Sequence, residues 1–175
     1  MDNNDRLIRL RYALDIKDTD MVKIFKLGGI ELTKEEVQKM LIKSKDYYND
    51  EADDHDDIEE KEENIKCNSN TLESFLNGFI IFKRGKRDLK PGQSERSALS
   101  IKDSGSVNNV MLKKLKIALS LTSEDMLDIL EEAQVIVTKG ELSALFRKEG
   151  HKHYKVCGDK YARNFLKGLA KKYRS

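Results

Sequence analysis

Residues 4–43 read NDRLIRLRYALDIKDTDMVKIFKLGGIELTKEEVQKMLIK, and residues 109–148 repeat the pattern without a gap as NVMLKKLKIALSLTSEDMLDILEEAQVIVTKGELSALFRK. The two stretches carry the same residue type at 12 of 40 aligned positions. A second match begins farther along and pairs Cys67, Phe75, Leu76, Gly78 and Arg84 with Cys157, Phe165, Leu166, Gly168 and Arg174. We therefore interpret the chain as a tandem duplication of one module.

Apolar residues in both stretches recur at the spacing of an amphipathic helix. Leu7, Leu10 and Leu14 share one face of a helix that we expect to begin at Asn4, its N-cap. The fold is thus expected to be all-α, with two four-helix modules related by approximate internal two-fold symmetry. The remaining helices are predicted to begin at Asp18, Thr33 and about Asn70 in the first copy, and at Ser123, Thr138 and Asp159 in the second.

Two features of these helices are predicted to be structural. The third helix of each copy begins with the residue spacing of a capping box, in which a hydroxyl and a carboxylate each accept a hydrogen bond from a backbone amide. Gly78 and Gly168 fall within the fourth helices, where glycine costs about 1 kcal/mol relative to alanine. A close helix crossing would explain both glycines, and a solvent-facing position is the alternative. The capping boxes pair Thr33 with Glu36 and Thr138 with Glu141.

The domain boundaries follow from the repeat. We assign residues 1–85 to the first module, 86–108 to a linker and 109–175 to the second module. A module of this size has a small core on its own, so the two are expected to share or abut one core. Residues 47–66 form an insert that the second copy lacks.

The insert is strongly acidic. Residues 46–63 contain eleven Asp and Glu residues and one lysine. Because so much charge and so little apolar surface cannot offset the entropy of ordering the chain, we interpret the insert as a disordered loop. A divalent-cation site is the alternative, although the segment lacks the spaced acids and turn glycine of a calcium loop. Because this segment is so acidic, the rest of the chain is strongly basic, although the formal net charge of the whole chain is only +2.

The pattern disfavours several classes of location and chemistry. No apolar run approaches the ~18 residues of a membrane span, and the acidic, polar start differs from a secretory signal. We therefore expect a cytoplasmic protein that does not enter a membrane. Its two cysteines, Cys67 and Cys157, are then expected to be reduced and buried, with a disulfide between them as the alternative.

The sequence contains no recognisable catalytic or metal-binding motif. The glycines of residues 78–87 lie too far apart for a phosphate-binding loop. His151, His153 and Cys157 are close in sequence, but no fourth zinc ligand follows them, and the first copy keeps only the cysteine. We accordingly expect no catalytic residues, no metal and no cofactor.

Both fourth helices end in basic residues. Such clusters bind phosphate groups, so nucleic acid or another polyanion is one expected partner. Cations are also favoured at the carboxyl end of any helix, which is the structural alternative. Whether the two clusters share one face or lie at opposite ends is left open by the sequence. The clusters consist of Lys83, Arg84, Lys86 and Arg87 in the first copy and of Lys171, Lys172 and Arg174 in the second.

Two other functions remain as alternatives. A protein-interaction or regulatory module would use the acidic insert to bind a basic protein partner. A helix-turn-helix DNA-binding regulator would use the second and third helices of each copy, although Lys34 and Glu35 mix charges where base reading favours Arg, Asn or Gln. Nothing in the sequence indicates the oligomeric state.

The segment FLNGFIIFKRGKR at residues 75–87 resembles the YehS-like family of small bacterial proteins. The LRYAL segment at residues 10–14, the DMV segment at residues 20–22 and the doubled layout support the same resemblance. It covers all of the chain except the acidic insert, which is longer than the family pattern. The family's domain is one of unknown function, so the resemblance implies a soluble bacterial protein with two copies of the module and transfers no activity or site.

Overall fold

The computed structural model describes residues 1–42, 65–85, 106–148 and 150–174, and all regular elements in these ranges are α-helices. The predicted all-α fold is therefore confirmed. Most of the acidic insert and of the linker lies outside the described residues. None of the described helices is long and apolar enough to cross a membrane. The helices are α1 (Asn3–Ala13), α2 (Asp18–Leu27), α3 (Lys34–Met40), α4 (Ser69–Arg84), α5 (Val107–Ala118), α6 (Ser123–Glu132), α7 (Lys139–Leu145) and α8 (Asp159–Arg174).

The helices of the second half correspond to those of the first. The bounds of α6 and α7 lie 105 positions after those of α2 and α3, and the bounds of α8 lie 90 positions after those of α4. The left-handed residues that follow the first helices also correspond, because Asp15 has a φ of 52° and Ser120 a φ of 54°. Helix α5 begins at Val107, inside the segment that we had assigned to the linker.

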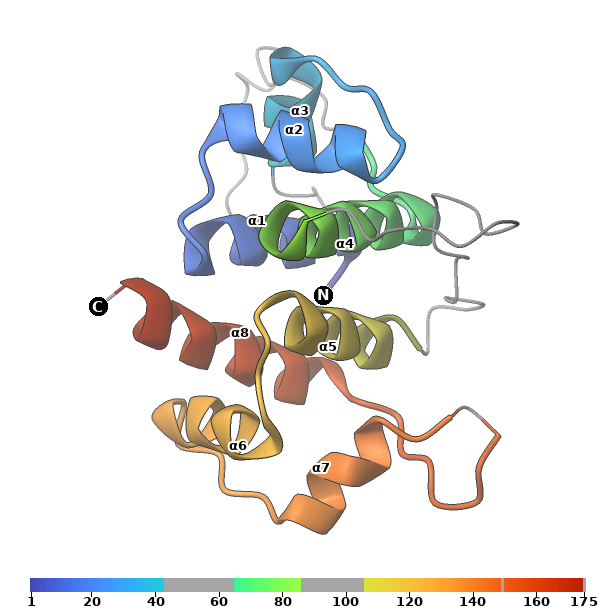
Figure 1. Ribbon diagram of the computed structural model, residues 1–175, viewed down its shortest axis with the longest axis vertical. Coiled ribbons are helices and arrows are strands. Elements are labelled where there is room, and N and C mark those ends of the chain that lie inside the picture. The colour runs from blue at the N-terminus through green and yellow to red at the C-terminus, as the bar shows by residue number, and fades with distance from the viewer. Residues whose placement is uncertain (43–64, 86–105, 149, 175) are drawn as a thin grey trace, which may run out of the picture.

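Four helices form the centre of the molecule, and the others cover it from two sides (Figure 1). Helices α2 and α3 lie above the central helices α1, α4, α5 and α8, and helices α6 and α7 lie below them. Each half places its first helix against the last helix of the other half, so that α1 packs on α8 and α5 packs on α4. One cluster of buried apolar residues consequently runs through both halves.

An asparagine at the start of each half joins the amino ends of two central helices. The amide of Asn4 donates to the carbonyls of Met40 and Ile65, at 2.9 and 2.7 Å, and its oxygen accepts from the amide of Cys67 at 3.0 Å. Asn109 makes the same three bonds, to Leu145, Lys155 and Cys157, at 2.9, 2.9 and 2.8 Å. The amino end of α1 is thereby held beside that of α4, and α5 beside α8.

The N-cap prediction for Asn4 was wrong. Asp2 caps α1, since its carboxylate accepts from the amide of Asp5 at 2.8 Å. Asn4 lies inside the first turn and is buried. Its amide is satisfied by segments 36 and more positions away, and the local spacing of apolar residues contains no signal of them. The two capping boxes at Thr33 and Thr138 are present, and a third, at Thr122 and Asp125, begins α6.

Gly78 and Gly168 lie where two helix backbones meet. A Cβ atom on Gly78 would stand 1.9 Å from the carbonyl oxygen of Ile24 on α2, and one on Gly168 would stand 2.0 Å from that of Ile129 on α6. Both distances are far below any van der Waals contact, so only glycine allows these crossings. In the first half Gly28 is equally constrained by the carbonyl oxygen of Ser74, at 1.9 Å.

Candidate polyanion interface at the carboxyl ends of the central helices

The four central helices all point the same way. The asparagine contacts place the amino ends of α1 and α4 together and those of α5 and α8 together. At the other end, Arg84 of α4 reaches the last turn of α5, and Arg174 of α8 reaches the last turn of α1. Figure 1 shows all four helices ending on the side of the molecule where the chain terminates. This side therefore collects the last carbonyl groups of four helices, which are the negative ends of the helix dipoles.

Two arginines cap these carbonyls reciprocally. Arg174 donates to the carbonyl of Tyr12 and to the carboxylate of Asp15, both at 3.0 Å. Arg84 donates to the carbonyl of Ile117 at 3.1 Å and to the hydroxyl of Ser120 at 2.8 Å. Each half thus supplies the arginine that caps the first helix of the other half. Capping of helix carbonyls by cations was the structural alternative for the basic clusters, and both arginines have this role.

The structure brings the described basic residues of both copies to this one end. Lys83, Lys171 and Lys172 are exposed there beside the two arginines. The ammonium of Lys171 donates to the carbonyl of Glu132 at 3.0 Å, at the end of α6. Those of Lys83 and Lys172 lie 5.9 Å from the ring centroids of Phe79 and Tyr173. Lys86 and Arg87 lie outside the described residues.

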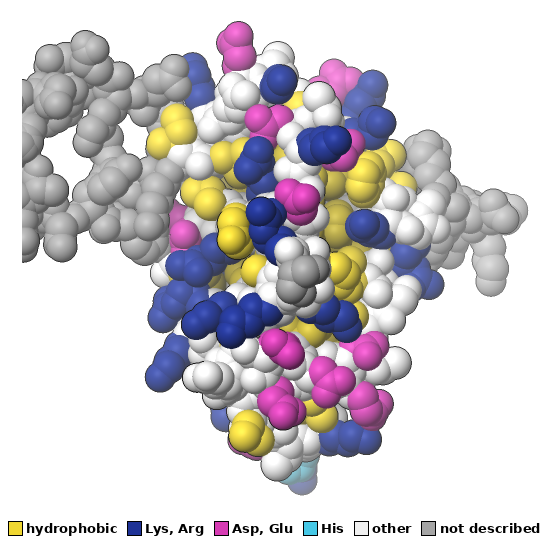
Figure 2. All heavy atoms as spheres, turned by 90° about the vertical axis from the view of Figure 1, so that its left-hand side faces the viewer, with side chains coloured by type: hydrophobic (Ala, Val, Ile, Leu, Met, Phe, Trp, Pro, Cys, Tyr) yellow, Lys and Arg dark blue, Asp and Glu magenta, His cyan; other side chains and the backbone are white. Residues whose placement is uncertain are grey.

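Basic side chains dominate the middle of this face. Figure 2 looks onto it and shows Lys and Arg side chains in a band across the centre, with Asp and Glu side chains gathered below. Helix α6 lies on the lower side and exposes Glu124, Asp128, Glu131 and Glu132. These carboxylates would repel a phosphate chain along the lower edge of the band, so only the band itself could bind one.

Sequence reasoning missed two exposed aromatic side chains beside the cluster. Tyr12 is 60% exposed, and the guanidinium of Arg174 lies 4.3 Å from its ring centroid. Tyr173 is 40% exposed, and burial of the rest of its side chain together with the charge of Asp125 raises the pKa of its hydroxyl. The available signal was that Tyr12 falls outside the apolar face formed by Leu7, Leu10 and Leu14.

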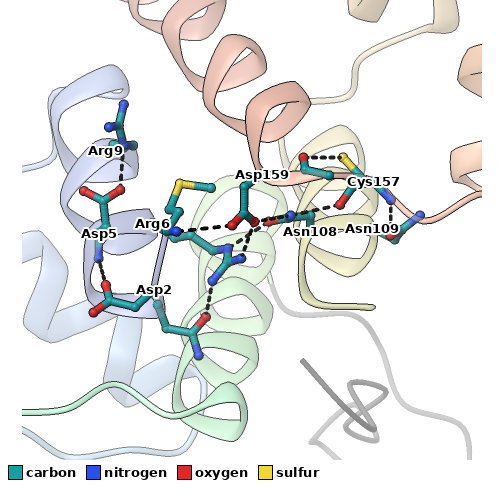
Figure 3. A network of polar contacts seen from close by, with 11 residues as sticks. Asp2, Asp5, Arg6, Arg9, Asn108, Asn109, Cys157 and Asp159 are labelled. Carbon is teal, nitrogen blue, oxygen red and sulfur yellow. Dashed lines mark hydrogen bonds and ion pairs between the residues drawn. The ribbon is translucent and has the colours of Figure 1, made fainter. Parts of the chain in front are cut away.

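The opposite end of the central helices contains a partly buried polar network (Figure 3). Arg6 of α1 donates to the side-chain oxygen of Asn108 at 2.8 Å and to Asp159 at 3.1 Å. The amine of Met1 lies 3.2 Å from the same carboxylate. Burial alone would raise the pKa of Asp159, but the bonds from Asn108 and the Met1 amine and the charge of Arg6 bring it below its ordinary value. The network joins α1 to α5 and α8.

A second buried charge pair lies between α4 and α5. The ammonium of Lys114 is 3.5 Å from the carboxylate of Glu73 and donates to the side chain of Asn77 at 2.6 Å. Glu73 is fully buried. Burial lowers the pKa of Lys114, and the facing carboxylate opposes that shift in part. The pair lies between the two helices and links them.

The two cysteines are buried, and the two described histidines lie on the surface. Cys67 and Cys157 are free and buried, and burial raises the pKa of each thiol to about 12, so the reactive thiolate is scarce at neutral pH. His151 and His153 are exposed in the loop before α8. Within the described ranges no three His, Cys, Asp or Glu side chains are grouped to hold a metal ion.

Comparison with known proteins gives a family but no assigned activity. A family model described as "Protein of unknown function (DUF1456)" matches residues 3–85 and 108–175. The chain is 37% identical over 168 residues to the uncharacterized protein YehS of Escherichia coli (strain K12), a match that covers 96% of this chain and 94% of the relative. No solved structure matches.

Proposed function

Since this chain belongs to the DUF1456 family of proteins of unknown function, we propose from its geometry that it is a non-enzymatic helical module that binds nucleic acid or another polyanion. The binding surface is the carboxyl end of the four central helices. The resemblance to the YehS-like family, first noted in residues 75–87, is confirmed by the comparisons. A cytoplasmic location, which the two free thiols support, would give access to such ligands.

The observation that carries the proposal is the meeting of two distant basic clusters at one end. Arg84 and Arg174 are 90 positions apart in the chain, yet each caps a helix that ends on the same side. Clusters at opposite ends could not follow one phosphate backbone. Clusters on one face can, and phosphate contacts of this kind position a nucleic acid with little sequence preference.

The lysines are the groups that would contact phosphate. Arg84 and Arg174 are held by carbonyl oxygens, and their charge is partly offset by the negative helix ends. Lys171 and Lys172 are exposed on the last turn of α8, and a lysine ammonium can leave a weak contact for a phosphate because its stem is flexible. The expected affinity is therefore moderate and strongly dependent on salt.

We also infer that the two halves are copies of one module, related by an approximate two-fold axis along the central helices. The repeated asparagine contacts, glycine crossings and arginine caps support this inference. Such symmetry brings the carboxyl ends of the two fourth helices to the same end of the molecule. The duplication would thereby create the binding face.

The test is a fluorescence anisotropy titration with labelled single- and double-stranded oligonucleotides. Four phosphate contacts would lower the affinity about 100-fold between 50 and 200 mM salt. Replacing Lys171 and Lys172 with Glu should weaken binding at least tenfold and reduce the slope of log K against log salt by about two. Arg174 stays in place, so the cap of α1 is kept.

The matched control reverses two charges at the other end of α8. Lys152 and Lys160 are exposed in the loop before the helix and in its first turn. Replacing both with Glu changes the net charge by the same amount, and binding should stay within about twofold of the wild type, since local phosphate contacts dominate the affinity. Equal losses in both double variants, or no binding by the wild type near 50 mM salt, would overturn the proposal.

A further inference from the structure

Tyr12 is an exposed aromatic residue in the last turn of α1. It is 60% exposed, and the guanidinium of Arg174 lies 4.3 Å from its ring centroid. Two further hydrogen bonds, to the carbonyl of Tyr12 and to the carboxylate of Asp15, orient the guanidinium over the ring. The ring and the cation therefore form a pair at the end of α1.

A second ring–cation pair lies on the last turn of α8. Tyr173 precedes Arg174 on the last turn of α8, is 40% exposed, and has the ammonium of Lys172 at 5.9 Å from its ring centroid. A single exposed aromatic residue needs no explanation in a folded protein. Two of them, each next to a cation and both at the end where the basic clusters meet, form a surface suited to flat, anionic molecules.

The equivalent end of the other half shows that the ring is not needed for the fold. Arg84 caps α5 with the same geometry as Arg174 caps α1, but the residue at the position of Tyr12 is Ile117. Ile117 is 41% exposed. The arginine cap thus forms without an aromatic partner, so the cap does not account for the tyrosine.

We propose that the α1–α8 end binds single-stranded nucleic acid, with bases stacked on Tyr12 and Tyr173 and phosphates at Lys171 and Lys172. This assignment rests on the proposed polyanion function and names its ligand. Single strands expose the faces of their bases, which stack on aromatic side chains with little regard to sequence. A duplex hides those faces, and an inorganic or sugar polyanion has no base to stack.

The experiment compares three labelled probes at about 50 mM salt: a thymidine oligonucleotide, an abasic oligonucleotide of equal length, and a duplex hairpin. The wild type should bind the thymidine strand at least about tenfold more tightly than the abasic strand, since both carry the same phosphates and only one carries bases. The duplex should bind no better than the abasic strand.

Tyr12→Ile is the informative variant, because it reproduces the residue that the equivalent end already carries. It should weaken binding of the thymidine strand about tenfold and leave binding of the abasic strand within twofold. Tyr12→Phe should keep the wild-type preference, since the stacking face is retained. Ile117→Ala is the matched control and should change neither affinity. The thermal midpoint of each variant checks that the helices are intact.

Intrinsic fluorescence gives an independent readout. The chain has no tryptophan and six tyrosines, so its emission reports tyrosines directly, and stacking of bases should quench part of it. Tyr12→Phe should lose a share of that quenching while still binding. Equal affinity for thymidine and abasic strands would overturn the stacking assignment and leave the polyanion function standing. Failure of all probes to bind would overturn both.

Discussion

The contact between α1 and α8 and the contact between α5 and α4 join equivalent helices, yet different charges stabilise them. Lys114 on α5 meets the buried carboxylate of Glu73 on α4. The equivalent of Lys114 on α1 is Arg9, and the equivalent of Glu73 on α8 is Arg163. Two cations cannot pair, so Arg9 instead forms an ion pair with Asp5, 2.9 Å away on its own helix.

Some contacts occur in both halves of the molecule, and others occur in one half only. Both halves keep the asparagine that ties two amino ends, the glycine at a backbone crossing and the arginine that caps a carboxyl end. The halves differ in the buried ion pair, in the polar network around Arg6 and in the exposed ring of Tyr12. We expect the shared contacts to govern folding in both halves and the unshared ones to act at one place only.

The largest expected effect comes from breaking a shared contact. Gly168→Leu and Gly78→Leu should each destabilise the protein by more than ~3 kcal/mol, above the usual cost of overpacking, because a backbone carbonyl occupies the space of the new Cβ atom. Chemical denaturation measures the change. Gly140→Ala is the control, since its Cβ atom would come no closer than 3.9 Å to any neighbour, and it should be neutral or stabilising by up to ~1 kcal/mol. A small loss of stability in either the Gly78→Leu or the Gly168→Leu variant would contradict the equivalence of the two helix crossings.

A smaller effect should follow from removing the unshared ion pair. Lys114→Met takes away the ammonium that faces the fully buried carboxylate of Glu73, and we expect a loss of about 3 kcal/mol. Arg9→Met at the equivalent position should cost less than ~1 kcal/mol, because Arg9 is 41% exposed in its pair with Asp5. Denaturation of the two variants under one condition tests the difference. Similar losses would show that the two inter-half contacts do not differ in this respect.

The smallest effect concerns acid stability at the amino ends. The pKa of Asp159 in the folded protein lies below its ordinary value of 3.8, so its ionised form stabilises the fold at higher pH, and that stability is lost as the pH falls through the folded value. Asp159→Asn should therefore cost about 1 kcal/mol at neutral pH and nothing in strong acid. Unfolding measured across pH 2–7 would test this expectation.

Ser69 provides the control for Asp159, because it holds the equivalent position in the first half and does not titrate in this range. Ser69→Ala should shift stability by the same amount at every pH. A pH-independent cost for Asp159→Asn would mean that the carboxylate acts through packing or hydrogen bonds alone, and it would remove this difference between the halves.

The helices could be read from the sequence because the forces that define them are local. Apolar residues three and four positions apart form the buried faces, and the pairs Thr33–Glu36 and Thr138–Glu141 satisfy amides within one turn. The repeat predicted a shared constraint at Gly78 and Gly168, because a residue that is unfavourable in a helix occurs at both of these equivalent positions. The basic residues of the candidate site were likewise visible from their positions at the ends of the two fourth helices.

Only the tertiary structure decided what those basic residues do and where they meet. Arg174 donates to a carbonyl 162 positions earlier in the chain, Asn4 donates to a carbonyl 61 positions away, and Lys114 on α5 pairs with Glu73 on α4. Such partners leave no periodic trace, since a hydrogen bond between distant segments constrains only its two ends. The direction of the four central helices follows from contacts of this kind. That direction, rather than any local pattern, places Tyr12 and the described basic residues of both clusters at one end of the molecule.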